Sequence, residues 1–173
     1  MSIDILKASV ARHRGYAKAN RFSVNIFPAV TTGIRGITNE LNLYADSVSI
    51  PGKQIGSYDY ALNSLMNIVK HPQGYTLEDV EITFNLTNTY FIKRLFDNWQ
   101  KAIIDDKYML HYPDNYEATI LINQLDEKNR FVYGVKLLQA YPITINNIGL
   151  SNESTNTISK LSVTFTYTSI ENI

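Results

Sequence analysis

The segment from residue 78 to residue 104 changes its hydrophobic period in the middle. Val80, Ile82 and Phe84 alternate with polar residues, which is the pattern of a strand with one buried and one solvated face. From residue 91 onward, apolar side chains recur every three or four positions, and charged or amide side chains fill the opposite side. This period predicts an amphipathic helix at about 89–104 that docks on the neighbouring strands. The residues expected on its packing face are Phe91, Leu95, Phe96, Trp99 and Ile103.

Much of the remaining chain shows the two-residue alternation that is typical of strands. Strands are predicted at 21–27, 41–50, 54–63, 65–70, 117–125, 130–140 and 161–167. The strand at 41–50 changes phase at Asp46-Ser47, which indicates a β-bulge. A polar turn at 126–129 joins two strands into a hairpin, and there is no strand–helix–strand rhythm. The chain is therefore predicted to be mainly antiparallel β, as an α+β fold with one docked helix.

The two strands predicted between residues 54 and 70 have no clearly apolar face. Pro72 and Gly74 are expected to end the second strand. Strands without a buried face pack poorly within their own domain and leave their edges open. We therefore expect these strands to find hydrogen-bonding partners only in neighbouring identical copies. The residues assigned to this inter-subunit region are Gln54, Tyr58, Tyr60, Leu62, Met66 and Ile68.

The first 21 residues are basic, with five Lys or Arg residues against Asp4 alone and a net charge of +4, whereas the whole chain has a net charge of zero. We interpret this leader as an arm that docks on an acidic surface or on phosphates, with a solvated, partly helical leader as the alternative. Its apolar residues Ile3, Leu6 and Val10 have the spacing of a short helix that packs on a neighbour. The basic residues assigned to the docking arm are Lys7, Arg12, Arg14 and Lys18.

Composition narrows the class of protein. The 173 residues and the 45% hydrophobic content fit a single folded domain, with a leader at 1–20 and a body at 21–173. The chain contains no Cys, which excludes disulfides and thiol catalysis. Because the net charge is zero, the overall charge does not indicate binding to nucleic acid or membranes. Since no apolar run approaches the roughly 20 residues of a membrane span and the start lacks the apolar core of a signal peptide, we expect a cytoplasmic chain without a membrane anchor.

The sequence contains few residues whose spacing is typical of a catalytic or metal site. The histidines His13, His71 and His111 are scattered, without partners at metal-ligand spacing. The pair Asp105-Asp106 follows the end of the predicted helix and is interpreted as part of a solvated loop. The sequence contains no nucleophile elbow, phosphate-binding loop or dinucleotide fingerprint. We expect no catalytic residue, no cofactor and no metal site, and the chain is not expected to be an enzyme.

Seven segments, in order along the chain, resemble the tail tube proteins of contractile-tailed bacteriophages. They lie at 19–27, 45–52, 80–84, 91–104, 112–125, 140–143 and 161–167, and include ADSVSIPG at 45–52 and LSVTFTY at 161–167. The leader and residues 53–74 depart from the family's pattern, which leaves a tube subunit and the related baseplate tube-initiator protein both open.

The resemblance implies a sandwich or barrel of two packed antiparallel sheets with a helix on its flank. It implies hexameric rings with a continuous β-lined lumen, to which the strands at 54–70 are assigned, stacked into the tail tube of a virion that is assembled in the host cytoplasm. The implied partners are further copies of the chain, the tail sheath protein and the baseplate tube-initiator proteins. The tape-measure protein and DNA would pass through the lumen without specific binding. Two other hypotheses stay open: a secreted tube of a related bacterial injection system, and a monomeric β-barrel that binds a small ligand.

Overall fold

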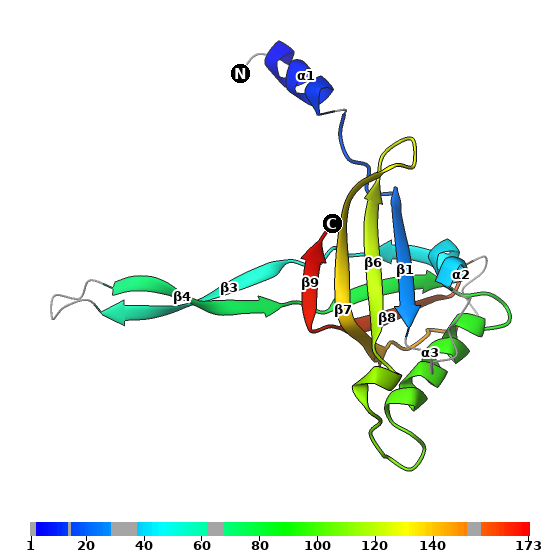
Figure 1. The fold of residues 1–173 in the computed structure, drawn as a ribbon. Helices are drawn as coiled ribbons and strands as arrows, with labels where there is room; N and C mark the ends of the chain where they lie inside the picture. Colours follow the sequence, from blue (N-terminus) through cyan, green and yellow to red (C-terminus); the bar gives the residue numbers. More distant parts are fainter. Residues whose placement is uncertain (1–2, 14, 29–37, 62–67, 152–156) are drawn as a thin grey trace.

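A computed structural model describes residues 3–13, 15–28, 38–61, 68–151 and 157–173 of the chain (Figure 1). A β-rich body lies at the centre, the N-terminal helix projects beyond one end of it, and a long hairpin projects from its side. In chain order the elements are α1 (Ile3–Arg12), β1 (Phe22–Pro28), α2 (Thr38–Tyr44), β2 (Ala45–Val48), β3 (Lys53–Ala61), β4 (Ile68–Leu77), β5 (Val80–Asn85), α3 (Phe91–Ile103), a 3-10 turn η1 (Pro113–Asn115), β6 (Ala118–Leu125), β7 (Phe131–Ile145), β8 (Lys160–Thr166) and β9 (Ser169–Asn172).

Strand β7 belongs to both layers of the body. The strand order is β1-β6-β7-β8-β5-β2, with β9 also paired to β7, and all of these pairings are antiparallel. The first part of β7 pairs with β6 and β9, whereas residues 141–145 pair with β8. Between these parts Gln139 has a φ of 55°, next to a shift in the register with β6. Such a bulge bends a strand, so β7 turns the corner between two packed antiparallel sheets.

The core fills the space between the two sheets, and α3 covers one end of it. Phe96 and Trp99 of α3 lie against Phe84 of β5 and Phe165 of β8, with ring centroids 5.3–6.1 Å apart. All four side chains are fully buried. The indole N–H of Trp99 donates a hydrogen bond of 2.7 Å to the carbonyl oxygen of Tyr116, so the polar atom of this buried ring is also satisfied. The helix predicted at 89–104 is therefore present at 91–103 and docked on the strands.

The strand predicted at 41–50 is wrong in its first half. Residues 38–44 form the helix α2, and only Ala45–Val48 is a strand. Leu41 is fully buried and Leu43 is 79% exposed. This burial explains the error, because Leu41 and the half-buried Tyr44 are three residues apart and share one face of a helical turn. The predicted bulge is present, since the pairing of β2 with β5 shifts register between Ala45 and Ser47.

The other predicted strands of the body are present. The strands at 21–27, 117–125, 130–140 and 161–167 correspond to β1, β6, the first part of β7, and β8. Strand β7 extends past Pro142 to Ile145, and β9 was not predicted. The architecture is thus mainly β, with two antiparallel sheets and one main helix.

Candidate assembly interface

Strands β3 and β4 form a separate two-stranded antiparallel hairpin that extends away from the body (Figure 1). They pack mainly against each other. Every residue of β4 before Leu77 is exposed, and so are the residues of β3 up to Tyr60. A hairpin of this length with both faces in water has no core of its own. The exposed apolar side chains that it presents are Ile55, Tyr58, Tyr60, Ile68, Val69 and Tyr75.

Two parts of the prediction for this region are wrong. The strands were expected to lack partners within one copy, but they pair with each other over nine cross-strand pairs, from Lys53 with Leu77 to Ala61 with Ile68. The second strand was expected to end before Pro72 but continues to Leu77. The register shifts between Ser57 opposite Pro72 and Gly56 opposite Gly74, so a bulge accommodates the proline. What stays unsatisfied in one copy is the outer edge of each strand and both faces of the hairpin.

The predicted inter-subunit residues fall on this hairpin where the structure describes them. Gln54, Tyr58 and Tyr60 lie on β3, and Ile68 is the first residue of β4. Tyr58 pairs with His71 and Tyr60 with Val69, so both tyrosine rings share one face of the hairpin. The remaining two residues, Leu62 and Met66, lie outside the described residues.

The helix residues singled out from the sequence point into the core. Leu95, Phe96, Trp99 and Ile103 are buried. Phe91, at the start of α3, is half-buried with its ring 6.2 Å from that of Tyr44 in α2. The sequence reasoning missed Ile92, which is fully buried on the same helix.

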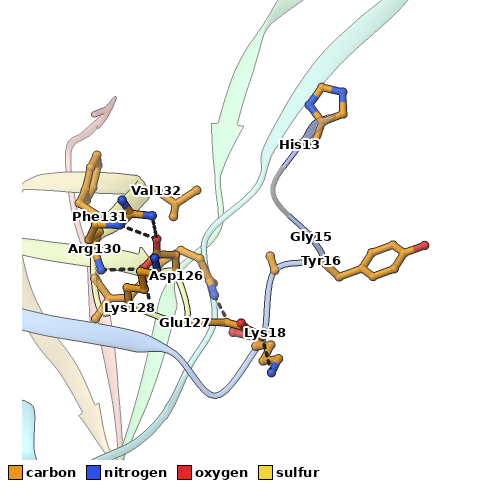
Figure 2. Close-up of a pocket in the computed structure, with 13 residues that line it drawn as sticks. His13, Gly15, Tyr16, Lys18, Asp126, Glu127, Lys128, Arg130, Phe131 and Val132 are labelled. Atoms are coloured by element: carbon orange, nitrogen blue, oxygen red, sulfur yellow. Dashed lines mark hydrogen bonds and ion pairs between the residues drawn. The ribbon is translucent and has the colours of Figure 1, made fainter. Parts of the chain in front are cut away.

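The basic arm divides into a free part and a tethered part. Lys7 and Arg12 are exposed on α1, which has no buried residue, and Arg14 lies outside the described residues. Lys18 forms an ion pair of 2.6 Å with Glu127 in the β6–β7 turn, and its carbonyl oxygen accepts a hydrogen bond from Gln124. Figure 2 shows these contacts beside a shallow pocket of about 700 Å³ between the arm and the turn.

The β6–β7 turn that holds the arm is itself ordered by carboxylates. Asp126 accepts hydrogen bonds from the backbone N–H groups of Lys128 and Arg130 and pairs with the Arg130 guanidinium. The backbone hydrogen bond from Arg130 is the main cause that lowers the pKa of Asp126. The hydrogen bond from Lys18, helped by its charge, lowers the pKa of Glu127. The lowered pKa values mean that both carboxylates interact more favourably in their charged form, so the Lys18–Glu127 pair favours the docked position of the arm at neutral pH.

A second concave surface lies between α3 and β7 at the other end of the body. This groove of about 680 Å³, which we call the α3–β7 groove, has isoleucines at its floor and rim, with Ile104 and Ile143 partly exposed. Its lining residues are Asp97, Gln100, Lys101, Ile103, Ile104, Tyr141, Pro142 and Ile143.

The outer faces of the two sheets carry hydrogen-bonded polar side chains and paired charges. On the outer face of the β5–β8 pair the hydroxyl groups of Thr83 and Ser162 are hydrogen-bonded at 3.0 Å. Lys136 on β7 pairs with Glu171 on β9 at 3.3 Å. Lys160 pairs with Asp46 at 2.7 Å, and its hydrogen bond lowers the pKa of that carboxyl. Neither sheet therefore presents a strongly charged surface along these pairs.

Among the residues that the structure describes, no three His, Asp or Glu side chains are grouped so that they could hold a metal ion. No helix in the described segments is long and apolar enough to cross a membrane.

Comparisons with known proteins show the family of the chain. A search of curated proteins found no match. The fold is similar to a chain of the PVC extracellular contractile injection system sheath–tube complex in its extended state, with a TM-score of 0.69 and 14% identity, over 100% of this chain and 98% of that chain. It is also similar to a chain of the 6-fold symmetrised baseplate of the anti-feeding prophage, with a TM-score of 0.67 and 13% identity, over 91% and 95% of the two chains.

A third similar structure is the tube-terminating cap of the anti-feeding prophage, with a TM-score of 0.67 and 15% identity, over 91% of both chains. At these identities the structures show a shared fold. The family follows from the sequence, because the family model described as phage tail tube protein matches residues 17–171. The resemblance inferred from the sequence is thereby confirmed: the chain belongs to the phage tail tube protein family.

Proposed function

We propose that the protein is the tube subunit of a contractile phage tail, and that it assembles into hexameric rings that stack into a tube. The observation that carries this proposal is the β3–β4 hairpin, which projects from the body with both faces exposed. A two-stranded hairpin alone in water is marginally stable at best. In our proposal a neighbouring copy covers the exposed Tyr and Ile side chains of the hairpin and forms hydrogen bonds with its open strand edges.

The body offers strand edges to such a neighbour. In the described part of the chain β1 and β2 end the folded sheet, and β9 pairs only with β7. Each of the two sheets contains four strands when β7 is counted in both. Six copies with four strands each, at ~4.8 Å between strands, would give a barrel roughly 37 Å in backbone diameter before strand tilt widens it. This bore is wide enough for a DNA duplex about 20 Å across.

The hydrogen-bonded polar side chains and paired charges on the outer faces of the sheets also support a conduit. A strongly basic lumen would bind each passing phosphate and slow ejection. On the sheets the charged residues Lys136 and Lys160 are paired with carboxylates, so a lumen built from either face would hold few phosphate contacts. DNA and a tape-measure protein would then pass without specific binding.

The partners and location follow from the same proposal. A sheath protein would surround the tube, and a baseplate would start it, as the names of the similar sheath–tube and baseplate structures suggest. The mature protein would reside in the virion after assembly in the host cytoplasm. Baseplate initiator proteins share the fold, and they would form single rings that do not extend into tubes.

The proposal is tested by measuring the mass and the shape of the purified full-length protein. Light scattering over a range of concentrations, combined with negative-stain microscopy, should show hexamers of the 19.7 kDa chain and stacked rings. Rings that never stack would favour the baseplate initiator role. A monomer at every concentration would refute the proposal and favour a β-barrel that binds a small ligand.

A further inference from the structure

Helix α1 is amphipathic, and among the residues that the structure describes it has no buried side chain. Ile3, Leu6 and Val10 recur at spacings of three and four residues, so they lie on one face. Ile3 is 68% and Leu6 is 50% exposed, and Val10 is half-buried. Isolated helices of ten residues are marginal in water, because most helix stability in proteins comes from packing of the apolar face. The apolar stripe of α1 therefore requires a surface that its own body does not supply.

The opposite end of the body has an apolar surface of matching size. The α3–β7 groove lies along α3, whose 13 residues span about 20 Å, whereas the ten residues of α1 span about 15 Å. Ile143 at the groove is 43% exposed, and Ile104 at its end is also exposed. The loop after α3 adds the exposed apolar side chains of Tyr108, Met109 and Leu110. A helix of the length of α1 can thus lie against this surface with its apolar stripe covered.

The charges of the two surfaces are complementary. Helix α1 carries Lys7 and Arg12 against Asp4, a net charge of +1, and Lys7 lies next to the apolar stripe. The loop that follows the groove carries Asp105, Asp106, Asp114 and Glu117 against Lys107, and Asp106 is paired at 3.5 Å with Lys101 of the groove lining, so the acidic residues remain in excess. Opposite potentials of this kind favour one orientation of docking and oppose contacts between two leaders.

The two surfaces lie at opposite ends of one molecule. In Figure 1 α1 projects beyond the end that holds the β6–β7 turn, whereas α3 and the loop after it lie at the other end. A helix cannot reach the groove of its own chain in this arrangement. A contact between different surfaces of successive copies is heterologous, so it generates a closed ring if the rotation between copies closes and an open filament if it does not.

We propose that α1 of one copy docks in the α3–β7 groove of a second copy in the next ring, so that it joins the rings along the tube axis. This inference rests on the proposed tube function, which it deepens by naming the segment and the surface of an axial contact. The second copy is the occupant that the charge complementarity and the head-to-tail placement favour.

The test uses the absence of Cys in the chain, because any thiol cross-link must then involve introduced residues. The full-length double variant Leu6→Cys/Ile143→Cys is assembled and treated with a short bis-maleimide. Denaturing gels should show a ladder of products that extends beyond the hexamer. The matched control, Ala8→Cys/Ile143→Cys, places the thiol on the opposite face of α1 and should lose the ladder.

The other outcomes overturn the inference in distinguishable ways. Tubes without a ladder would leave the tube function standing and would assign the groove to another partner, such as a sheath protein. Products that stop at the hexamer would mean a contact within one ring, and an internally cross-linked monomer would mean docking on the same body. Wild-type protein that never forms rings would refute both the inference and the proposed function.

A second variant checks the same contact without cross-linking. Leu6→Asp should leave the folded body intact, because α1 has no buried residue. The fluorescence spectrum of Trp99, the single Trp of the chain, should therefore be unchanged in this variant. The variant should form rings and lose tubes. Normal tubes of Leu6→Asp would overturn the inference.

Discussion

The indole N–H of Trp99 in α3 donates a hydrogen bond of 2.7 Å to the carbonyl oxygen of Tyr116, which lies between η1 and β6. This bond ties the only Trp of the chain, which is fully buried, to the segment that enters the first sheet. The helix is thus fixed both by its apolar face and by one polar contact at its centre.

Trp99→Phe should lower the free energy of unfolding by about 1–3 kcal/mol, because the carbonyl of Tyr116 loses its hydrogen-bond donor at a partly buried site. Urea unfolding followed by circular dichroism measures this loss. Trp99→Lys should abolish soluble expression, since it places a charge among Phe84, Phe96 and Phe165. Normal yield and melting of the Lys variant would refute the docked-helix account.

Gly134 on β7 has little room for a side chain. A Cβ at this position would lie 2.6 Å from Oδ1 of Asn123, 2.8 Å from the ring of Phe131 and 3.2 Å from the carbonyl oxygen of Ile122. Since the two nearest atoms belong to side chains that can shift, the half-exposed Phe131 among them, Gly134→Ala is expected to destabilise the body by about 1 kcal/mol, the lower end of what overpacking costs. Gly149→Ala is the matched control, because nothing lies within 4 Å of its Cβ. Equal melting temperatures of the two variants would contradict the close packing at Gly134.

Tyr58 on the hairpin should matter for assembly and little for folding. Its side chain is 47% exposed and contacts only the hairpin partner His71 among described aromatic rings, at 5.8 Å. Tyr58→Asp is expected to change the free energy of unfolding by no more than about 0.5 kcal/mol, as for ordinary surface sites. It should nevertheless prevent ring formation, measured by light scattering. Tyr58→Phe keeps the aromatic ring and should assemble. Normal assembly of Tyr58→Asp would contradict the assignment of the hairpin to the interface.

The tether of the arm should respond to acid. The pKa of Glu127 in the folded chain is lowered by Lys18 from its ordinary value of 4.5. A lowered pKa means that the contact contributes stability above the ordinary value and loses it as the pH falls through the folded pKa. The backbone amide NMR signals of residues 17–18 should therefore shift as the pH falls below about 4, and trypsin should cleave slowly at Lys18 at pH 7. Glu127→Gln should show fast cleavage at pH 7, and an unchanged rate would contradict the tether.

The alternation of apolar and polar residues predicted the strands of the body, which have one buried face. It did not predict the extent of the hairpin strands, which have no buried face. The alternation of Ile82 and Phe84 with polar residues reports burial directly, so β5 was found. On β3 and β4 the neighbours of Tyr58 and Tyr60 carry no such signal, because both faces are exposed in one copy. Pro72 predicts a strand end, but a bulge in the hairpin accommodates this proline within β4.

Two further differences have local causes. The position of Leu41 in the sequence is compatible with both a strand and a helical turn. In the structure Leu41 is buried where α2 packs against β1 and β5, which favours the helix. Strand β9 has four residues, Ser169–Asn172, which is too short for a period to be read. The assembly surfaces were located only in outline, since the groove beside α3 is formed by residues far apart in the sequence, such as Ile104 and Ile143.

In our proposal the β3–β4 hairpin becomes complete only against a neighbouring copy. The most direct measurement is an electron cryo-microscopy map of the assembled full-length protein at a resolution that separates strands. The account predicts rings of six copies in which each hairpin lies against the adjacent copy, with Tyr58 and Tyr60 buried in the contact. A map in which the hairpin stays exposed on both faces, or particles that are monomers without a channel, would contradict it.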